Sequence, residues 1–192
     1  MSTRDFEVCL GAIEFKCLNM EDNLSLIADI SEEEIQEAVW QCDGSKSPGP
    51  DHYNFNFIKQ SWGFMKNEIV VAVALFLEMG VIPKGCNASF IALLAKVRDL
   101  VKLNQYIPIS LEGALHKIIS EVLSNKIKNV LSSVINESQL AFLKDRGMLD
   151  SVLMANEVVE DLRRNKRSGM CLKVDYEKAY DSVRWEFLYD ML

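Results

Sequence analysis

The stretch "LKVDYEKAYDSVRWEFL", residues 172–188, decides the fold because it reads as a strand, an aspartate and a helix in succession. The apolar run "MCLKVDY" (170–176) predicts a short strand that carries Asp175 near its end, and "SVRWEFLYDML" (182–192) predicts the helix. A carboxylate at the end of a strand is well placed for Mg²⁺, which prefers oxygen ligands. The same carboxylate could instead cap the turn into the helix, and the residues alone leave both roles open.

The side chains that follow Asp175 keep the same alternatives open. Glu177 and Asp181 are the nearest further carboxylates, and Tyr180 could pack beside a bound sugar or inside the core. Phosphoryl transfer with two metal ions needs carboxylates around ions about 3.5–4 Å apart, so Asp175 cannot complete such a site alone. A phosphotransferase with Asp175 as nucleophile is a weaker alternative, because Glu177 stands where that chemistry expects a second aspartate.

The composition predicts a globular protein of the cell interior. Of the 192 residues, 49% are hydrophobic and 26% are charged, which is typical of a folded domain. The longest apolar run, residues 69–82, contains Glu78 and Gly80, so it predicts a buried helix and not a membrane span. Asp5 and Glu7 argue against a secretory signal. Five scattered cysteines without a C-x-x-C pair predict free thiols and no zinc site.

The negative charge is concentrated at the N-terminus. Residues 1–50 carry 11 acidic and 3 basic side chains, whereas residues 51–192 carry 17 acidic and 18 basic ones. The larger part of the chain can therefore hold a local basic surface for nucleic acid, although the whole chain has a net charge of −7. A basic run at Arg163–Arg167 fits such a surface, and it fits equally well a solvated helix end that complements the helix dipole.

Hydrophobic periodicity predicts an α+β fold with long helices and few short strands. Ser31 and Glu34 have the spacing of a capping box at the start of a helix. Two prolines and two glycines make residues 43–51 a loop. Helices are predicted over residues 31–42, 55–80 (as one or two), 113–135, 149–169 and 182–192, and extended segments over 89–97, 106–111 and 170–176.

Four blocks in order, "KSPGPD" (46–51), "YIPISL" (106–111), "QLAFLKDRG" (139–147) and the opening stretch, resemble the reverse transcriptase domain of non-LTR (LINE-type) retrotransposons, especially the plant kind. The likeness runs from about Ile35 to Leu192. It implies the fingers and partial palm of a right-hand polymerase, with an incomplete palm sheet. It also implies RNA-directed DNA polymerase chemistry with Mg²⁺, an RNA template, a DNA primer and dNTP, in an intracellular protein that could act in the nucleus.

The resemblance assigns roles to individual residues. Asp175 matches the first catalytic aspartate and metal ligand, with Val174 and Tyr176 beside the metal. Tyr180 matches the aromatic gate against ribonucleotides. On the nucleotide side the resemblance matches Lys96 and Arg146. Near the template it matches Lys46, in the "KSPGPD" block, and Gln139. Arg163 and Arg164 are further candidate template contacts, because they belong to the basic run.

Several positions depart from the family pattern. Ile107 stands where the family has an arginine that clamps the triphosphate, and isoleucine offers no hydrogen-bond donor. Asp145 precedes Arg146 where glycine is usual, and Ala95 replaces the proline before Lys96. His52 replaces a glycine that could be required for the conformation of the backbone at this position. These departures predict weakened nucleotide binding.

The family's second carboxylate motif, Tyr-x-Asp-Asp, is not found in the 192 residues. We therefore expect a truncated reverse transcriptase that does not polymerise alone, and the alternative function is a non-catalytic nucleic-acid-binding remnant. The expected divisions are an N-terminal segment of undecided structure (1–30), a fingers-like helical region (31–168) and the start of the palm (169–192).

Overall fold

The computed structural model describes residues 16–99, 102–136, 139, 143, 147–170 and 182–191. The chain divides into two compact units, Met1–Asp145 and Arg146–Leu192, and each is described by itself. The predicted helix-rich α+β fold with few strands is confirmed. The elements are α1 (Met20–Ile27), α2 (Glu32–Gln41), α3 (Phe55–Gln60), α4 (Trp62–Met79), β1 (Ser89–Ala95), the 3₁₀ helix η2 (Leu103–Gln105), β2 (Tyr106–Glu112), α5 (Ala114–Val134), α6 (Met148–Arg164) and α8 (Trp185–Met191).

Helix α2 begins with the predicted capping box. The Ser31 hydroxyl accepts from the Glu34 N–H at 3.2 Å, and a Glu34 carboxylate oxygen accepts from the Ser31 N–H at 2.8 Å. The apolar side chains of Ile35, Ala38 and Val39 are buried on one side of the helix. They join one core with residues of α3, α4 and α5, made of Ile35, Ala38, Val39, Phe55, Ile58, Trp62, Ile69, Val73, Ala114, Ile118, Ile119 and Val122.

The prediction that the apolar helix of residues 69–82 is buried is wrong for most of its surface. Helix α4 buries only Trp62, Ile69 and Val73, while Val71 is 57% exposed and Met79 is 65% exposed. Apolar residues occur on every side of this helix, so periodicity could not show which side the neighbouring helices α3 and α5 contact. No helix among the described residues is long and apolar enough to cross a bilayer.

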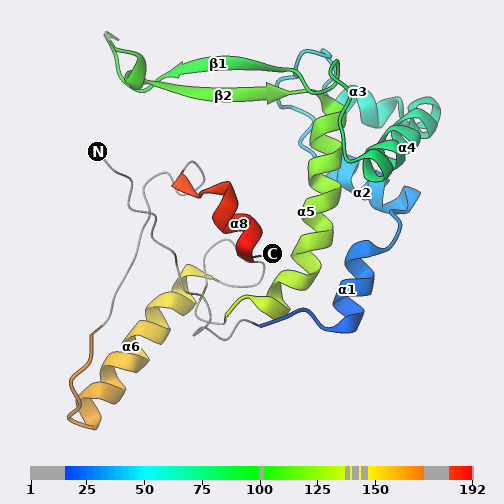
Figure 1. Cartoon of the computed structure of the whole chain (residues 1–192). Coiled ribbons are helices and arrows are strands. Elements are labelled where there is room, and N and C mark those ends of the chain that lie inside the picture. The colour runs from blue at the N-terminus through cyan, green and yellow to red at the C-terminus, as the bar shows by residue number, and fades with distance from the viewer. Residues whose placement is uncertain are drawn as a thin grey trace. The chain divides into compact units, whose positions relative to one another are not determined.

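Strands β1 and β2 form an antiparallel hairpin that extends from one end of α5, away from α1 (Figure 1). Leu94 pairs with Ile107 and Phe90 pairs with Leu111. Most side chains on both faces of this hairpin are exposed, because no further strand or helix of the described chain covers it. The two predicted extended segments, residues 89–97 and 106–111, are confirmed.

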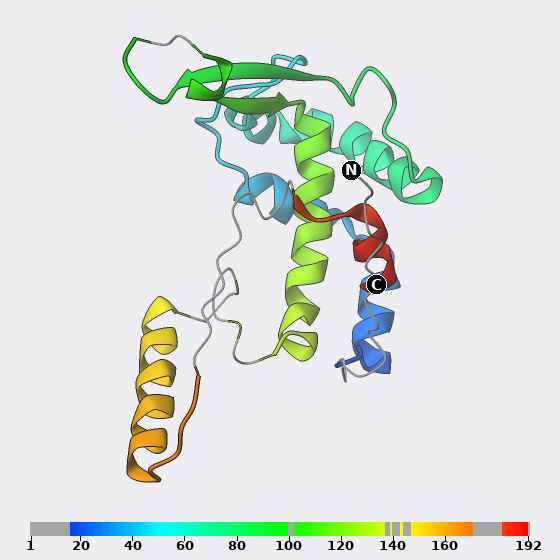
Figure 2. The same ribbon diagram turned by 60° about the vertical axis from the view of Figure 1, so that its left-hand side comes forward.

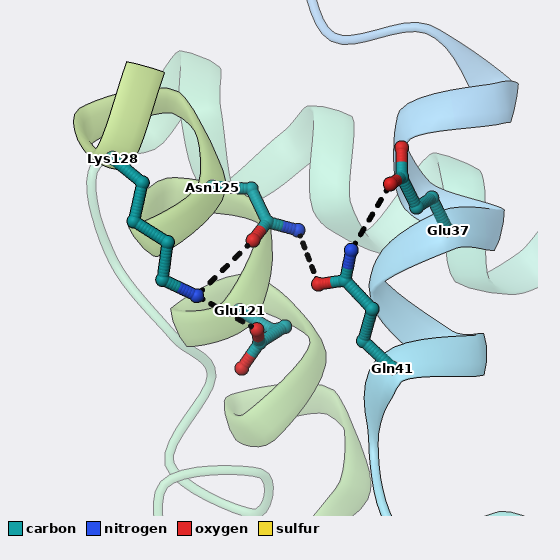
Figure 3. A network of polar contacts seen from close by, with 5 residues as sticks. All are labelled: Glu37, Gln41, Glu121, Asn125 and Lys128. Carbon is teal, nitrogen blue, oxygen red and sulfur yellow. Dashed lines mark hydrogen bonds and ion pairs between the residues drawn. The ribbon is translucent and has the colours of Figure 1, made fainter. Parts of the chain in front are cut away.

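Helices α1, α2 and α4 pack against α5, which runs beside α1 and α2 in both views (Figure 2). The buried face of α5 carries Ile118, Ile119, Val122 and Val130, whereas Ile127 is 49% exposed and lies off this face. A polar network links α5 to α2 (Figure 3): Asn125 donates to Gln41 at 2.8 Å, and Gln41 donates to Glu37 at 3.0 Å. Lys128 completes it by contacting both Asn125 and Glu121 at 3.3 Å.

Two helices have their C-termini capped by a lysine from another helix. Neither α1 nor α2 has a basic residue in its last turn. The Lys59 ammonium group, from α3, donates to the carbonyl oxygens of Trp40 at 3.0 Å and Cys42 at 2.7 Å at the end of α2. Lys126, from α5, contacts the carbonyl oxygen of Ala28 at the end of α1. Cations at these positions satisfy unpaired carbonyl groups and complement the helix dipole.

In the second unit, α6 ends earlier than predicted. The predicted end at Gly169 is wrong, because the chain turns at Lys166, whose φ of 50° is left-handed. The Lys166 N–H donates to the Arg163 carbonyl at 3.3 Å, and the Arg167 N–H donates to the Leu162 carbonyl at 2.9 Å. This is the Schellman pattern of helix termination. Consequently only Arg163 and Arg164 of the basic run lie in the last helical turn.

Candidate nucleotide- and template-binding surfaces

The hairpin places Lys96 and Ile107 on one face. The Lys96 N–H donates to the Gln105 carbonyl at 2.9 Å, so the strand pairing continues one residue beyond β1. Because side chains alternate along a strand, Lys96 shares its face with Leu94, and the partner of Leu94 is Ile107. The Lys96 side chain is exposed. One face of the hairpin therefore carries a cation, Lys96, diagonally across from an apolar side chain, Ile107.

The "KSPGPD" loop is attached to the junction between β2 and α5. A carboxylate oxygen of Asp51 accepts from the Ala114 N–H, the first of helix α5, at 2.5 Å. The N-cap residue of α5, Gly113, has no side chain to do this, so Asp51 supplies the cap from 63 residues away. Gly49 packs directly on the same junction: a Cβ there would lie 2.3 Å from the carbonyl carbon and oxygen of Glu112. Gly49 and Asp51 of this sequence block therefore stabilise the junction between β2 and α5.

His52 adopts the backbone conformation that the family's glycine suggests. Its φ is 62°, in the left-handed region, and its N–H donates to the Gly49 carbonyl at 3.0 Å. The prediction that the backbone conformation matters at this position is confirmed, since a left-handed conformation favours glycine over residues with a Cβ. The imidazole ring also lies beside Phe90 of β1, with ring centroids 6.3 Å apart.

Lys46 lies at the exposed start of the loop, near Asp43. The pKa of Asp43 is lowered, first because its carboxylate accepts from the Ser45 N–H and hydroxyl, and further by Lys46 and Lys59. The sequence around Lys59 did not indicate that this lysine lies near the loop, because tertiary packing alone brings it to the C-terminus of α2. Asp51 was likewise missed as a helix cap, for the same reason.

The other candidate template contacts lie apart from the loop in sequence. Gln139 is exposed. Arg163 is exposed as well, with its guanidinium 3.9 Å from the Glu160 carboxylate. Arg164 is exposed in the same helical turn. Arg167 is 2.7 Å from Asp161, so part of the basic run is engaged in holding the turn after α6.

The residues predicted for catalysis and metal binding lie outside the described residues, and these are Asp175, Val174, Tyr176 and Tyr180. Arg146, predicted for nucleotide binding, lies outside them as well. The predicted strand 170–176 falls largely in the same gap. Among the residues that are described, no group of three or more histidines, cysteines, aspartates and glutamates could hold a metal ion. The candidate residues that the structure describes are Lys46, Lys96, Gln139, Arg163 and Arg164.

Comparisons with known proteins identify the family. The chain is 26% identical over 185 residues, 92% of its length, to the transposon TX1 uncharacterized 149 kDa protein of Xenopus laevis. It is 24% identical over 172 residues, 85% of its length, to a retrovirus-related Pol polyprotein from the type-1 retrotransposable element R1 of Bradysia coprophila. It is 26% identical over 165 residues, 83% of its length, to the RNA-directed DNA polymerase from mobile element jockey of Drosophila funebris.

The chain spans 14% to 18% of the length of these relatives, so it corresponds to one part of much longer proteins. A family profile described as "Reverse transcriptase (RNA-dependent DNA polymerase)" matches residues 96–192, just over half of the chain. That match begins at Lys96, where the chain leaves β1 and enters the turn of the hairpin, and it includes β2, α5 and the stretch around Asp175. The chain therefore belongs to the reverse transcriptase family and represents part of the reverse transcriptase domain of a non-LTR retrotransposon.

Proposed function

We propose that this chain supplies the fingers and the first palm segment of an RNA-directed DNA polymerase, in an element of the plant kind. In this proposal Asp175 holds a Mg²⁺ ion with the backbone around Val174 and Tyr176, and Tyr180 contacts the nucleotide sugar. Lys96 and Arg146 face the dNTP. Lys46, Gln139, Arg163 and Arg164 contact the RNA template, to which a DNA primer is paired.

The observation that carries this proposal is the shared face of Lys96 and Ile107 on the hairpin. The strand register brings residue 107 next to the lysine, within the region that matches the family. A lysine and an arginine side by side would bind a triphosphate through charge-assisted hydrogen bonds, the arginine through two parallel donors. Ile107 has no such donors, so Lys96 supplies the only cation of this pair.

Restoring the second cation tests this arrangement. We expect Ile107→Arg to bind dTTP about tenfold more tightly than the parent chain, because a charge-assisted hydrogen bond contributes about 1.5–3 kcal/mol, part of which is lost in ordering the side chain. Isothermal titration calorimetry in the presence of Mg²⁺ measures the change. Lys96→Gln in the arginine variant should remove most of the gain.

Ser110 provides the matched control, because it lies on the same strand but pairs with Ile91 on the opposite face. Ser110→Arg adds the same charge and should leave dTTP affinity within about twofold. Equal gains from arginine at residues 107 and 110 would mean that only net charge matters, and the proposed nucleotide face would be wrong.

Primer extension tests whether these 192 residues form a complete polymerase active site, which neither the polymerase proposal nor the alternative of a non-catalytic nucleic-acid-binding protein expects. Both functions predict RNA binding by a polypeptide of these 192 residues. We expect no dNTP incorporation by this polypeptide, since its sequence holds no Asp-Asp pair to complete a two-metal site with Asp175. Incorporation that disappears in Asp175→Ala would contradict this expectation and show a complete active site.

A further inference from the structure

Three lysines from three separate elements lie around residues 42–47, the segment that leads from the end of α2 into the "KSPGPD" loop. Lys59 of α3 donates to the Cys42 carbonyl at 2.7 Å. Lys117 of α5 donates to the Ser47 carbonyl at 3.5 Å. Lys46 lies in the segment itself and is exposed. We call Lys46, Lys59 and Lys117 the lysine cluster.

The thiol of Cys42 lies close enough to all three lysines of the cluster for their charges to act on its pKa. Burial raises the pKa of Cys42, as does the nearby carboxylate of Glu121, whereas all three lysines of the cluster act to lower it. The two carboxylates in the neighbourhood are already bound: Asp43 accepts from Ser45, and Glu121 pairs with Lys128 at 3.3 Å.

Each ammonium group of the lysine cluster has more donors than the structure uses. An ammonium group offers three N–H donors and keeps its full charge when it binds a main-chain carbonyl. The carbonyl bonds of Lys59 and Lys117 hold two of the cations in place, so less side-chain entropy would be lost when a ligand binds them. Three cations around residues 42–47, two of them held by main-chain carbonyls, are suited to a ligand with several phosphates.

We propose that the lysine cluster binds the phosphate backbone of single-stranded RNA, with Lys59 and Lys117 acting beside Lys46. This inference rests on the proposed function, which supplies RNA as the polymer, and it extends the site to residues on α3 and α5. Phosphate contacts of this kind fix the position of a strand without reading its sequence.

The salt dependence of RNA binding tests the cluster. Neutralising three phosphate contacts on a single strand should reduce the slope of log K against log salt by about 2. We expect this reduction in the Lys46→Gln, Lys59→Gln, Lys117→Gln triple variant, measured by fluorescence anisotropy with a labelled 12-mer RNA. The matched control replaces Lys16, Lys66 and Lys84 by Gln, because none of these lysines is among the charges that act on Cys42.

Two further measurements protect the test against an unfolded variant. Lys46→Gln alone changes an exposed side chain and should reduce the slope by about 0.7 without shifting thermal unfolding. In the parent chain, saturating RNA should slow the alkylation of Cys42 at least about fivefold. The rate of alkylation is measured by mass spectrometry of the peptide that contains Cys42. The triple variant should show no such protection.

The outcomes distinguish the inference from the proposed function. If the triple variant and its control bound RNA with the same salt slope, the inference that the lysine cluster binds RNA would be wrong. The proposed function would still stand in that case. Absence of RNA binding by the parent chain would count against both. Equal protection of Cys42 by sodium tripolyphosphate at matched phosphate concentration would assign the cluster to free polyphosphate and overturn the assignment to RNA.

Discussion

Replacing Gly49 with alanine is expected to lower the free energy of unfolding of the N-terminal unit by about 3 kcal/mol or more. The new Cβ would lie 2.3 Å from the Glu112 carbonyl group and 2.6 Å from the Gly113 nitrogen. These atoms are main chain at the start of α5, so they cannot move aside as a flexible side chain would. The midpoint of thermal unfolding should fall by about 6–12 °C, measured by circular dichroism.

Gly63 is the matched control for this substitution. It lies in the first turn of α4, and a Cβ there would meet nothing within 4 Å. Alanine at residue 63 should raise stability by up to about 1 kcal/mol, because alanine loses less backbone entropy in a helix than glycine. If both alanine variants shifted stability in the same direction, the close approach of Gly49 to the β2–α5 junction would be wrong.

Removing the Asp51 carboxylate is the second large effect that we expect. Asp51→Ala leaves the first N–H of α5 without its acceptor and removes a negative charge from the positive end of the helix dipole. A lost cap of this kind costs about 1–2 kcal/mol. Chemical denaturation followed by fluorescence of the Trp40–Trp62 pair, whose rings are 5.5 Å apart, reports on this unit when Trp185 is replaced by phenylalanine.

Asp29 provides the control for the loss of charge, since it is an exposed aspartate outside any helix. Asp29→Ala should change stability by no more than about 0.5 kcal/mol. Asp51→Asn should fall between the two, because it keeps an oxygen acceptor but loses the charge. Equal stability of the Asp51 and Asp29 alanine variants would show that the contact with Ala114 contributes nothing measurable.

The sequence was informative wherever the relevant signal lies within a few residues. Ser31 and Glu34 are three positions apart, so their capping box and the start of α2 could be predicted. At His52 the resemblance indicated only that the usual residue is a glycine with a possible role in the backbone conformation, and the structure then shows a left-handed φ of 62° there. The assignments of β1 and β2 were also correct, because each short apolar run is bounded by turn residues.

Features that depend on distant parts of the chain could not be predicted. The caps that Asp51 and Lys126 provide join residues that are 63 and 98 positions apart. The exposed side of α4 was missed because a helix that is apolar all round carries no periodic signal for its buried side. The end of α6 was missed because Lys166, a residue with no preference for left-handed backbone, makes the turn in place of glycine.

The packing of α1, α2 and α4 against α5 also sets an order of events during synthesis. The ribosome makes residues 20–79 before any of α5, so the early helices leave the exit tunnel without the partner that covers them. At about 5–20 residues per second, the 55 residues from Gly80 to Val134 take roughly 3–11 s to translate. During that interval Ile35, Val39 and Val73 have no α5 against which to be buried, so the nascent chain passes through a stage in which chaperones can bind it.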